Sequence, residues 1–391
     1  MSRAGVVVLR AALPALLLPS VAAAEPYLRG VAQLSVGNGH VCTLTTAGEV
    51  ACWGDNAAGQ LGVGADGRTR GGQVTRPHVV GGLPRIAQVS AGAQHTCAVS
   101  VDGDVHCWGS AGGDRVDTAG GTSGSVELRG AALGTPVLMP IGKARAVHLS
   151  THTHDACAVT ADEVRCWNTV RAIPINARKV NAPTLRATKI AGATALAIGH
   201  GKVCAIAGGK MSCWSGGAPS AVAWGDAFTP VDVAIGESHA CARSAAGEVR
   251  CWQSLIDDFW KRAPDRIVKW PGKLATRALA VGDSPICTAD AAGTVDCFLA
   301  DEAGLPDQAA AASWATQAMA PHPIRNVERA VALGLGRGRD AFGYGFGCAL
   351  RGEADADGAQ VYCWGDNEHG QLGNGATARS KRAVRVLGSD R

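Results

Sequence analysis

Short stretches of alternating apolar and polar residues recur along the chain, and turn residues separate them. AQVSAG at 87–92 and CAVSVDGDVHCW at 97–108 show the two-residue period of half-buried strands. Apolar residues recurring at helical spacing would instead indicate a helical solenoid. The alternation therefore predicts an all-β fold built from short antiparallel strands.

The cysteines mark a repeat, because all 14 of them sort into seven consecutive pairs that each bracket a predicted hairpin. In four pairs the two cysteines are ten residues apart, with a glycine at the place where a three-residue loop requires a positive φ. These glycines are Gly48, Gly103, Gly247 and Gly293. The seven pairs are Cys42 with Cys52, Cys97 with Cys107, Cys157 with Cys166, Cys204 with Cys213, Cys241 with Cys251, Cys287 with Cys297, and Cys348 with Cys363.

The hairpin loops predict the strand register. Each pair of opposed residues is one rung of the hairpin, counted from the loop. Pairing outward from Ser100 and Asp104 places Cys97 opposite Cys107 on the fourth rung. In the two pairs that are nine apart, a two-residue turn leaves the cysteines on the same rung. Opposed residues have Cβ atoms about 4.5–5.5 Å apart, close to what a disulfide needs, so we predict seven local disulfides. Free core cysteines and a zinc site are the alternatives, and the chain has no C-x-x-C spacing that favours zinc.

Two further features repeat in phase with the cysteines. Glycine stands five residues before the first cysteine in six units, and His152 takes that place in the third. An aromatic residue follows the second cysteine in every unit, where it can pack one blade on the next: Trp53, Trp108, Trp167, Trp214, Trp252, Phe298 and Trp364. Units start 37 to 61 residues apart, a length that suits four-stranded blades. We therefore predict a seven-bladed β-propeller with four-stranded antiparallel blades.

The first, second and last units closely resemble repeats of the regulator of chromosome condensation family. The resemblance rests on VSAGAQHTCAVSVDGDVHCWG, CWGDNAAGQLGVG and CWGDNEHGQLGNG; the middle units lack the G-Q-L-G string. It implies a seven-bladed propeller whose ring is closed by strands from both chain ends. RAVRVLG, residues 382–388, resembles the strand TPVLMPIG that precedes another repeat. We accordingly expect this C-terminal strand to complete the first blade.

The N-terminal residues have the features of a secretory signal peptide. Arg3 and Arg10 precede an apolar run, and small residues end it at Ala24. We expect residues 1–24 to be the signal peptide and 25–391 the propeller, exported to the periplasm or the extracellular space, where disulfides persist. We expect no membrane span in the mature form, because the run is short, is interrupted by prolines and has no apolar successor.

Charge argues against a nucleic-acid partner. The formal net charge of +4 includes the two arginines of the signal peptide, and the chain has no long basic run interleaved with aromatic residues.

Three groups of residues are candidates for binding. Glu353, Asp355 and Asp357 alternate before Gly358 in the long seventh hairpin, like the first half of a calcium loop, although Trp364 stands where that loop has its glutamate. Calcium is the one cofactor these residues suggest; a solvated acidic loop is the alternative. Trp260, Trp270 and Trp314 lie between hairpins and are candidate contacts for a partner, or else pack on their own blades. His148, His152 and His154 would share one face of a strand, where they could bind a metal or form a polar edge.

The sequence has no nucleophile elbow, zinc-protease motif, phosphate loop or dinucleotide fingerprint. The first hypothesis is therefore an exported, monomeric binding platform rather than an enzyme, with a protein or glycan of the cell envelope or beyond as its partner. The second hypothesis, which the resemblance implies, is nucleotide exchange on a GTPase. The export signal argues against it. A third is a hydrolase or lyase, which requires carboxylates or histidines facing the centre of the ring.

Overall fold

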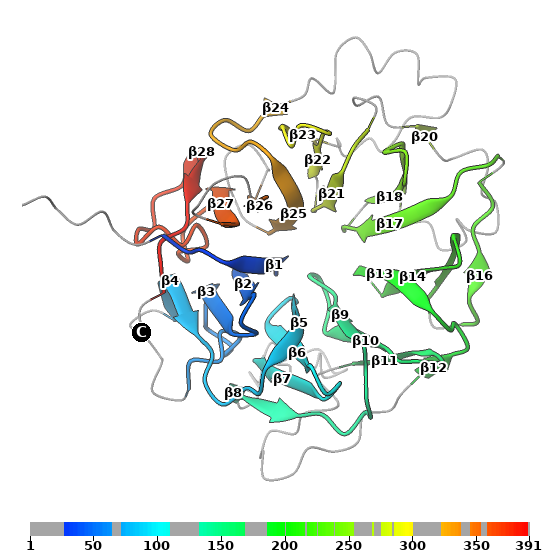
Figure 1. The fold of residues 1–391 in the computed structure, drawn as a ribbon, viewed down its shortest axis with the longest axis horizontal. Coiled ribbons are helices and arrows are strands. Elements are labelled where there is room, and N and C mark those ends of the chain that lie inside the picture. The colour runs from blue at the N-terminus through cyan, green and yellow to red at the C-terminus, as the bar shows by residue number, and fades with distance from the viewer. Residues whose placement is uncertain are drawn as a thin grey trace, which may run out of the picture.

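The structure, a computed structural model, describes residues 27–64, 72–109, 133–168, 186–199, 201–215, 217–224, 226–237, 239–253, 268–269, 275–283, 285–299, 322–337, 345–352 and 358–389. Within these ranges the strands form seven four-stranded antiparallel sheets, each built from strands consecutive in the chain. The sheets are the blades of a ring, and the first strand of every blade lies nearest its centre (Figure 1). In the same residues there is no helix of the length and hydropathy needed to cross a membrane.

The first strands of the blades have four to seven residues, and the second strands have five or six. The first strands are β1 (Val31–Val36), β5 (Ile86–Ala91), β9 (Ala146–Leu149), β13 (Ala193–Gly199), β17 (Pro230–Ile235), β21 (Ala278–Val281) and β25 (Ala330–Gly336). The second strands are β2 (His40–Thr45), β6 (His95–Ser100), β10 (Asp155–Val159), β14 (Lys202–Ala207), β18 (His239–Ser244), β22 (Pro285–Ala289) and β26 (Phe346–Arg351).

The two outer strands differ from each other, because only the third keeps its length in all blades. The third strands are β3 (Val50–Asp55), β7 (Val105–Gly109), β11 (Val164–Asn168), β15 (Lys210–Trp214), β19 (Val249–Gln253), β23 (Val295–Leu299) and β27 (Gln360–Gly365). The fourth strands are β4 (Gln73–Val79), β8 (Leu133–Leu138), β12 (Arg186–Thr188), β16 (Ser220–Ala221), β20 (Val268–Lys269), β24 (His322–Pro323) and β28 (Ser380–Arg385).

Every blade carries one disulfide between its second and third strands, which confirms the seven predicted pairs. The two cysteines of each pair are opposed in the strand register, and their Cα atoms are 4.0 to 4.1 Å apart. From blade 1 to blade 7, the disulfides join Cys42 to Cys52, Cys97 to Cys107, Cys157 to Cys166, Cys204 to Cys213, Cys241 to Cys251, Cys287 to Cys297, and Cys348 to Cys363.

The hairpin turns and the register inside them also agree with the sequence. The four loop glycines have φ between 79° and 88°, the positive values that a three-residue loop requires. In blade 2, Val99 lies opposite Val105 and Cys97 opposite Cys107. The spacing of the cysteines therefore predicted both the turn and the rung on which the sulfurs meet.

In the described parts of the chain, the hydrophobic core is divided into seven clusters, one for each junction between neighbouring blades. The aromatic side chain that follows the second cysteine of each blade is buried against the preceding blade, as predicted from its fixed position in the repeat. At the junction that closes the ring, Trp53 of blade 1 packs with Phe346, Leu372 and Val386 of blade 7. Its indole nitrogen donates a 2.8 Å hydrogen bond to the carbonyl of Gln371.

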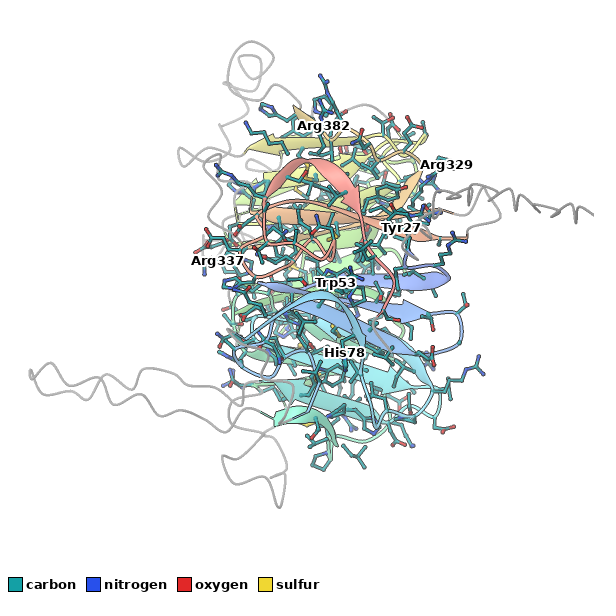
Figure 2. All side chains as sticks on the ribbon, turned by 90° about the vertical axis from the view of Figure 1, so that its left-hand side faces the viewer. Tyr27, Trp53, His78, Arg329, Arg337 and Arg382 are labelled. Carbon is teal, nitrogen blue, oxygen red and sulfur yellow. A yellow bond between two sulfur atoms is a disulfide. The ribbon has the colours of Figure 1, made fainter. Side chains whose placement is uncertain are left out.

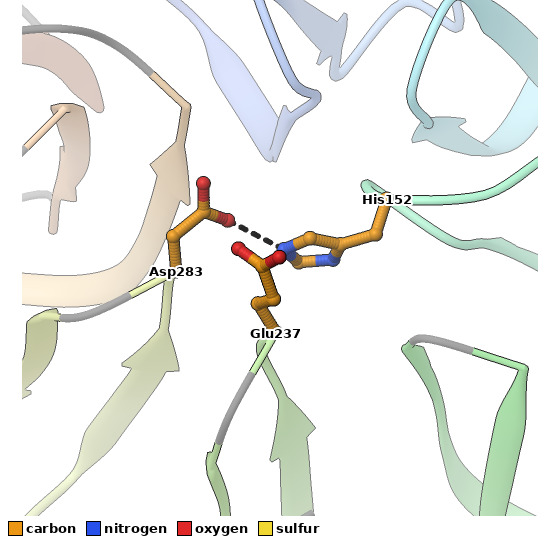
Figure 3. Close-up of side chains that lie close together, drawn as sticks. All are labelled: His152, Glu237 and Asp283. Carbon is orange, nitrogen blue, oxygen red and sulfur yellow. Dashed lines mark hydrogen bonds and ion pairs between the residues drawn. The ribbon is translucent and has the colours of Figure 1, made fainter. Parts of the chain in front are cut away.

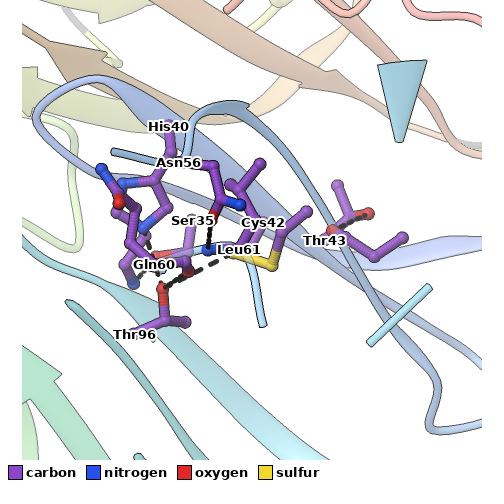
Figure 4. Close-up of a disulfide and its surroundings, with 11 residues drawn as sticks. Ser35, His40, Cys42, Thr43, Asn56, Gln60, Leu61 and Thr96 are labelled. Atoms are coloured by element: carbon purple, nitrogen blue, oxygen red, sulfur yellow. Dashed lines mark hydrogen bonds between the residues drawn. A yellow bond between two sulfur atoms is a disulfide. The ribbon is translucent and has the colours of Figure 1, made fainter. Parts of the chain in front are cut away.

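Polar groups are also satisfied across the junction between blades 1 and 2 (Figure 4). The Thr96 hydroxyl of blade 2 donates to the carbonyl of Gln60 at 2.8 Å and lies 2.8 Å from His40 Nε2 of blade 1. It is also 3.9 Å from the sulfur of Cys42. The G-Q-L-G loop of blade 1 is thereby tied to the next blade beside the disulfide.

The expectation that the C-terminal strand completes the first blade is wrong. β28, which contains most of RAVRVLG, pairs with β27 and is the fourth strand of blade 7. The strand in TPVLMPIG likewise pairs with the blade before it, as β8 on β7, so the tail follows the same rule as every other fourth strand. The N-terminal and C-terminal segments contact each other without forming a shared sheet: Tyr27 forms an isolated bridge with Leu387, and the Leu28 amide donates to the Val386 carbonyl at 3.2 Å.

Candidate functional site

The turns between the first and second strands of the blades meet at the centre of one face of the ring. In blade 1 the Gly37 amide closes the turn by donating to the His40 carbonyl at 2.8 Å. The next residue, Asn38, donates from its amide to the Gly92 carbonyl of blade 2 at 3.0 Å. A Cβ on Gly37 would lie 2.5 Å from that carbonyl oxygen. Glycine recurs here because neighbouring turns approach closely.

Two units depart from this turn, which corrects the sequence alignment at both. In blade 3 the turn begins at Ser150, whose amide donates to the Asp155 carbonyl at 2.9 Å, so His152 lies inside a turn two residues longer than that of blade 1. In blade 7 Gly336, paired with Phe346, takes the place of the repeated glycine. Gly343, which the cysteine spacing indicated, lies outside the described residues.

Among the residues that the structure describes, four side chains from four blades meet at the axis, and we call them the axial cluster: His152, Glu237, Asp283 and Arg337. Glu237 and Asp283 directly follow the turn glycines of blades 5 and 6, and Arg337 follows Gly336 of blade 7. The longer turn of blade 3 carries the His152 imidazole across to the two carboxylates (Figure 3).

The axial cluster is held by short polar contacts. His152 Nε2 lies 2.5 Å from Asp283 Oδ1, and Arg337 Nε donates to Asp283 Oδ2 at 2.8 Å. Arg337 also lies 3.8 Å from Glu237 Oε2. The Thr151 hydroxyl is 3.0 Å from His152 Nδ1. The His152 side chain is 7% exposed and that of Arg337 54% exposed.

The charges of the cluster keep Asp283 ionised. Burial alone would raise the pKa of Asp283, but the hydrogen bonds and positive charges offered by His152 and Arg337 outweigh it and hold that pKa below its usual value. One imidazole nitrogen and two carboxylate oxygens, all within 4.8 Å of one another, could contact a single cation.

The three predicted histidines do not share a face. His148 lies on β9 opposite Cys157, whereas His152 and His154 lie in the turn, where strand alternation does not apply. The His154 ring stacks on His95, with centroids 5.8 Å apart, so only His152 reaches the axial cluster.

The other candidates remain predictions. Glu353, Asp355 and Asp357, and likewise Trp260, Trp270 and Trp314, lie outside the described residues. The sequence reasoning missed Glu237, Asp283 and Arg337. Glu237 and Asp283 could have been found, because each is a charged residue directly after the repeated glycine, in two successive units.

Family models identify the repeats at the two ends of the described chain. Two models described as "Regulator of chromosome condensation (RCC1) repeat" match residues 47–99 and 359–386 and residues 31–60. These segments belong to blades 1, 2 and 7.

Individual relatives match over short segments. The ultraviolet-B receptor UVR8 of Arabidopsis thaliana is 40% identical over 79 residues, which is 20% of this chain and 17% of the receptor. The regulator of chromosome condensation of Mus musculus is 38% identical over 85 residues, 22% of this chain and 20% of the mouse protein. The matches thus span a fifth or less of either relative.

A solved structure agrees with the fold over nearly the whole chain. Yeast RCC1 (Prp20), in its complex with Kap60, superposes with a TM-score of 0.57 at 17% identity, covering 97% of this chain and 91% of the yeast chain. The repeat models and the sequence relatives show RCC1 repeats in blades 1, 2 and 7, and the fold comparison shows that the whole chain has the propeller fold of an RCC1-repeat protein.

Proposed function

We propose that this chain is an exported binding platform that engages a protein through the face bearing the axial cluster. One observation carries the proposal: every blade has its disulfide at the same position in the register, while the turn residues at the axis differ from blade to blade. Seven disulfides suit an oxidising compartment outside the cytoplasm. A stapled ring with variable polar turns is suited to holding a recognition surface rigid.

The fold comparison supports the binding role. RCC1-like propellers bind proteins, and the yeast relative was crystallised with Kap60 bound. At 17% identity that likeness extends to the fold alone, so neither Kap60 nor nucleotide exchange is carried over to this chain. We propose that the propeller is a monomer and that its partner is a protein in the cell envelope or outside the cell.

Site-specific photocrosslinking tests which face binds. A photoreactive residue is placed at Asn38, beside the axis, or at Asp102, in the β6–β7 hairpin turn at the opposite face. The two faces are separated in side view, where Arg337 and Arg329 mark them (Figure 2). We expect a discrete crosslinked partner from position 38 only, and N-terminal sequencing of the exported chain to begin at Glu25. Crosslinking from position 102 alone would refute the proposal. A chain that stays in the cytoplasm with residues 1–24 still attached would refute it as well.

A second candidate is a hydrolase or lyase acting at the centre of the ring. His152, Glu237 and Asp283 supply the histidine and carboxylates that such an activity requires there. Turnover of a lactone or polysaccharide by the wild type, abolished in Asp283→Asn, would favour this candidate over the binding platform.

A further inference from the structure

Going beyond the proposed binding role, we propose that the axial cluster is a site for one divalent transition-metal ion. The protein ligands are His152 Nε2 and one carboxylate oxygen each from Glu237 and Asp283. They come from blades 3, 5 and 6, so the ion joins turns of the ring that are far apart in the sequence.

The donor set selects the class of ion. Ca²⁺ and Mg²⁺ prefer oxygen ligands alone, whereas an imidazole with two carboxylates suits Zn²⁺, Mn²⁺ and similar first-row ions. Zinc bonds of about 2.0–2.2 Å bring ligand atoms to roughly 3–3.5 Å from one another. The donor atoms already lie within 4.8 Å, so small side-chain rotations complete the site. Three protein ligands leave at least one position for water or for a group of a bound partner.

The surroundings of His152 prepare it as a ligand. Without an ion, Nε2 carries the proton of its hydrogen bond to Asp283, and an entering ion displaces that proton. The Thr151 hydroxyl, 3.0 Å from Nδ1, can then accept a hydrogen bond from Nδ1–H, which leaves the Nε2 lone pair for the ion. Partners of this kind fix the tautomer and orientation of metal-binding histidines. The Ser150 hydroxyl accepts from the amides of His152 and Thr153 at 3.2 and 3.0 Å, and so shapes the longer turn that carries the imidazole to the axis.

Arg337 is the competitor of the ion. Its guanidinium contacts Asp283 and Glu237, and it balances part of their charge when no cation is bound. Because its side chain is more than half exposed, it can turn toward solvent when an ion enters. A site for a cation and a simple ion-pair cluster therefore predict different results when Arg337 is replaced.

The test measures metal binding to the mature, oxidised chain without a histidine tag. After removal of metal with chelator, Zn²⁺ is titrated calorimetrically, and Co²⁺ is added as a spectroscopic probe of nitrogen and oxygen ligation. We expect one Zn²⁺ per chain and a rise in Tm. His152→Ala, Glu237→Gln and Asp283→Asn should each weaken binding at least 10-fold, the lower end of the loss seen when even an outer-shell partner is removed. Arg337→Gln should bind at least as tightly as the wild type.

His78→Ala, which removes a half-buried imidazole from β4 of blade 1, is the matched control and should bind like the wild type. Tm values in chelator show that each variant is folded. If the wild type binds no stoichiometric Zn²⁺, or if folded His152→Ala and Asp283→Asn bind it as the wild type does, the site is refuted. Loss of binding in Arg337→Gln would equally count against it, because the cluster would then depend on the arginine and not compete with it.

Discussion

Blades 1, 2 and 7 differ from blades 3 to 6 in their outermost strand. β4, β8 and β28 have six or seven residues, whereas β12, β16, β20 and β24 have two or three. The recognisable RCC1 repeats fall in the first group. In blades 1 and 7 the G-Q-L-G loop leads into the long outer strand, and in blade 1 it is tied to the next blade through Thr96.

All seven blades nevertheless keep the stapled hairpin and the buried ring that follows it. The difference teaches which part of the repeat is indispensable. The fold tolerates an outer strand of two residues when the hairpin inside it is covalently closed, because the inner three strands and the aromatic side chain supply most of the core between blades 3 to 6.

The largest expected effect is that of reducing all seven disulfides. Each closes a loop of about 10–16 residues, worth roughly 2–3 kcal/mol in the chain-entropy model, against a net stability of about 5–15 kcal/mol for a typical domain. We expect the reduced and alkylated chain to lose its cooperative unfolding transition, with amide exchange rising first in blades 3 to 6. A reduced chain that melts within a few degrees of an oxidised, alkylated control would show that the staples are dispensable.

Acid should destabilise the part of the ring that contains the buried His40 and His95. Burial lowers the pKa of His40 to about 3, and burial followed by the charges of His154 and His40 lowers that of His95 to about 3. The unfolded state binds protons at the ordinary pKa near 6.5, so this stability is complete above pH 6.5 and is lost as the pH falls toward 3. Between pH 7 and 5 the two histidines together contribute a loss of about 4 kcal/mol.

Urea unfolding at the two pH values measures this loss. The double variant His40→Gln/His95→Gln should show a smaller difference between pH 7 and 5, and His78→Gln the same difference as the wild type. Amide exchange at pH 5 should rise first in blades 1 to 3, because burial also lowers the pKa of His148 in blade 3 to about 4. Blades 4, 6 and 7 have Lys202, Pro285 and Phe346 at the position of His40. An unchanged pH difference in the double variant would refute the assignment.

Deleting residues from Lys381 onward should open the junction between blades 7 and 1. The deletion removes Val386, which is fully buried against Trp53, and the bridge from Leu387 to Tyr27. We expect a loss of about 3 kcal/mol in unfolding free energy, the upper part of the range for one buried aliphatic side chain. Deletion of residues 389–391 is the control and should change little. Equal stability of the two truncated chains would mean that blade 7, like blades 3 to 6, does not need its outer strand.

Local patterns in the sequence predicted local structure, and failed where structure is not local. The cysteine spacing determined the hairpin register because a disulfide allows only one rung. β16, the two residues Ser220–Ala221, is too short to show any alternation. RAVRVLG was assigned to the wrong blade because a strand-like pattern does not tell whether it precedes or follows its hairpin. His152 and Asp283 are 131 residues apart, and only the closed ring brings them together.

The smallest effect concerns hydrogen bonds between the first strands. The Gln88 side-chain amide donates to the Val147 carbonyl and accepts from the Val147 amide, both at 2.9 Å, as Gln33 does with Val89 at slightly longer distances. Glutamine stands at this position in blades 1 and 2 only; four of the other five blades have alanine there. Gln88→Ala leaves two main-chain groups unpaired and should cost about 1–3 kcal/mol.

The reverse change tests whether this link between blades can be transferred. Ala146 occupies the position of Gln88 in blade 3, and Leu196 occupies the position of Val147 in blade 4. If the inner strands of the middle blades differ from those of blades 1 and 2 only in this side chain, Ala146→Gln should raise the unfolding free energy by about 1 kcal/mol, the net value of a typical hydrogen bond. Ala146→Leu, of similar size but unable to form the bonds, is the control. A gain shared by both variants would assign the effect to packing, and no gain in either would show that blades 3 and 4 are spaced differently from blades 1 to 3.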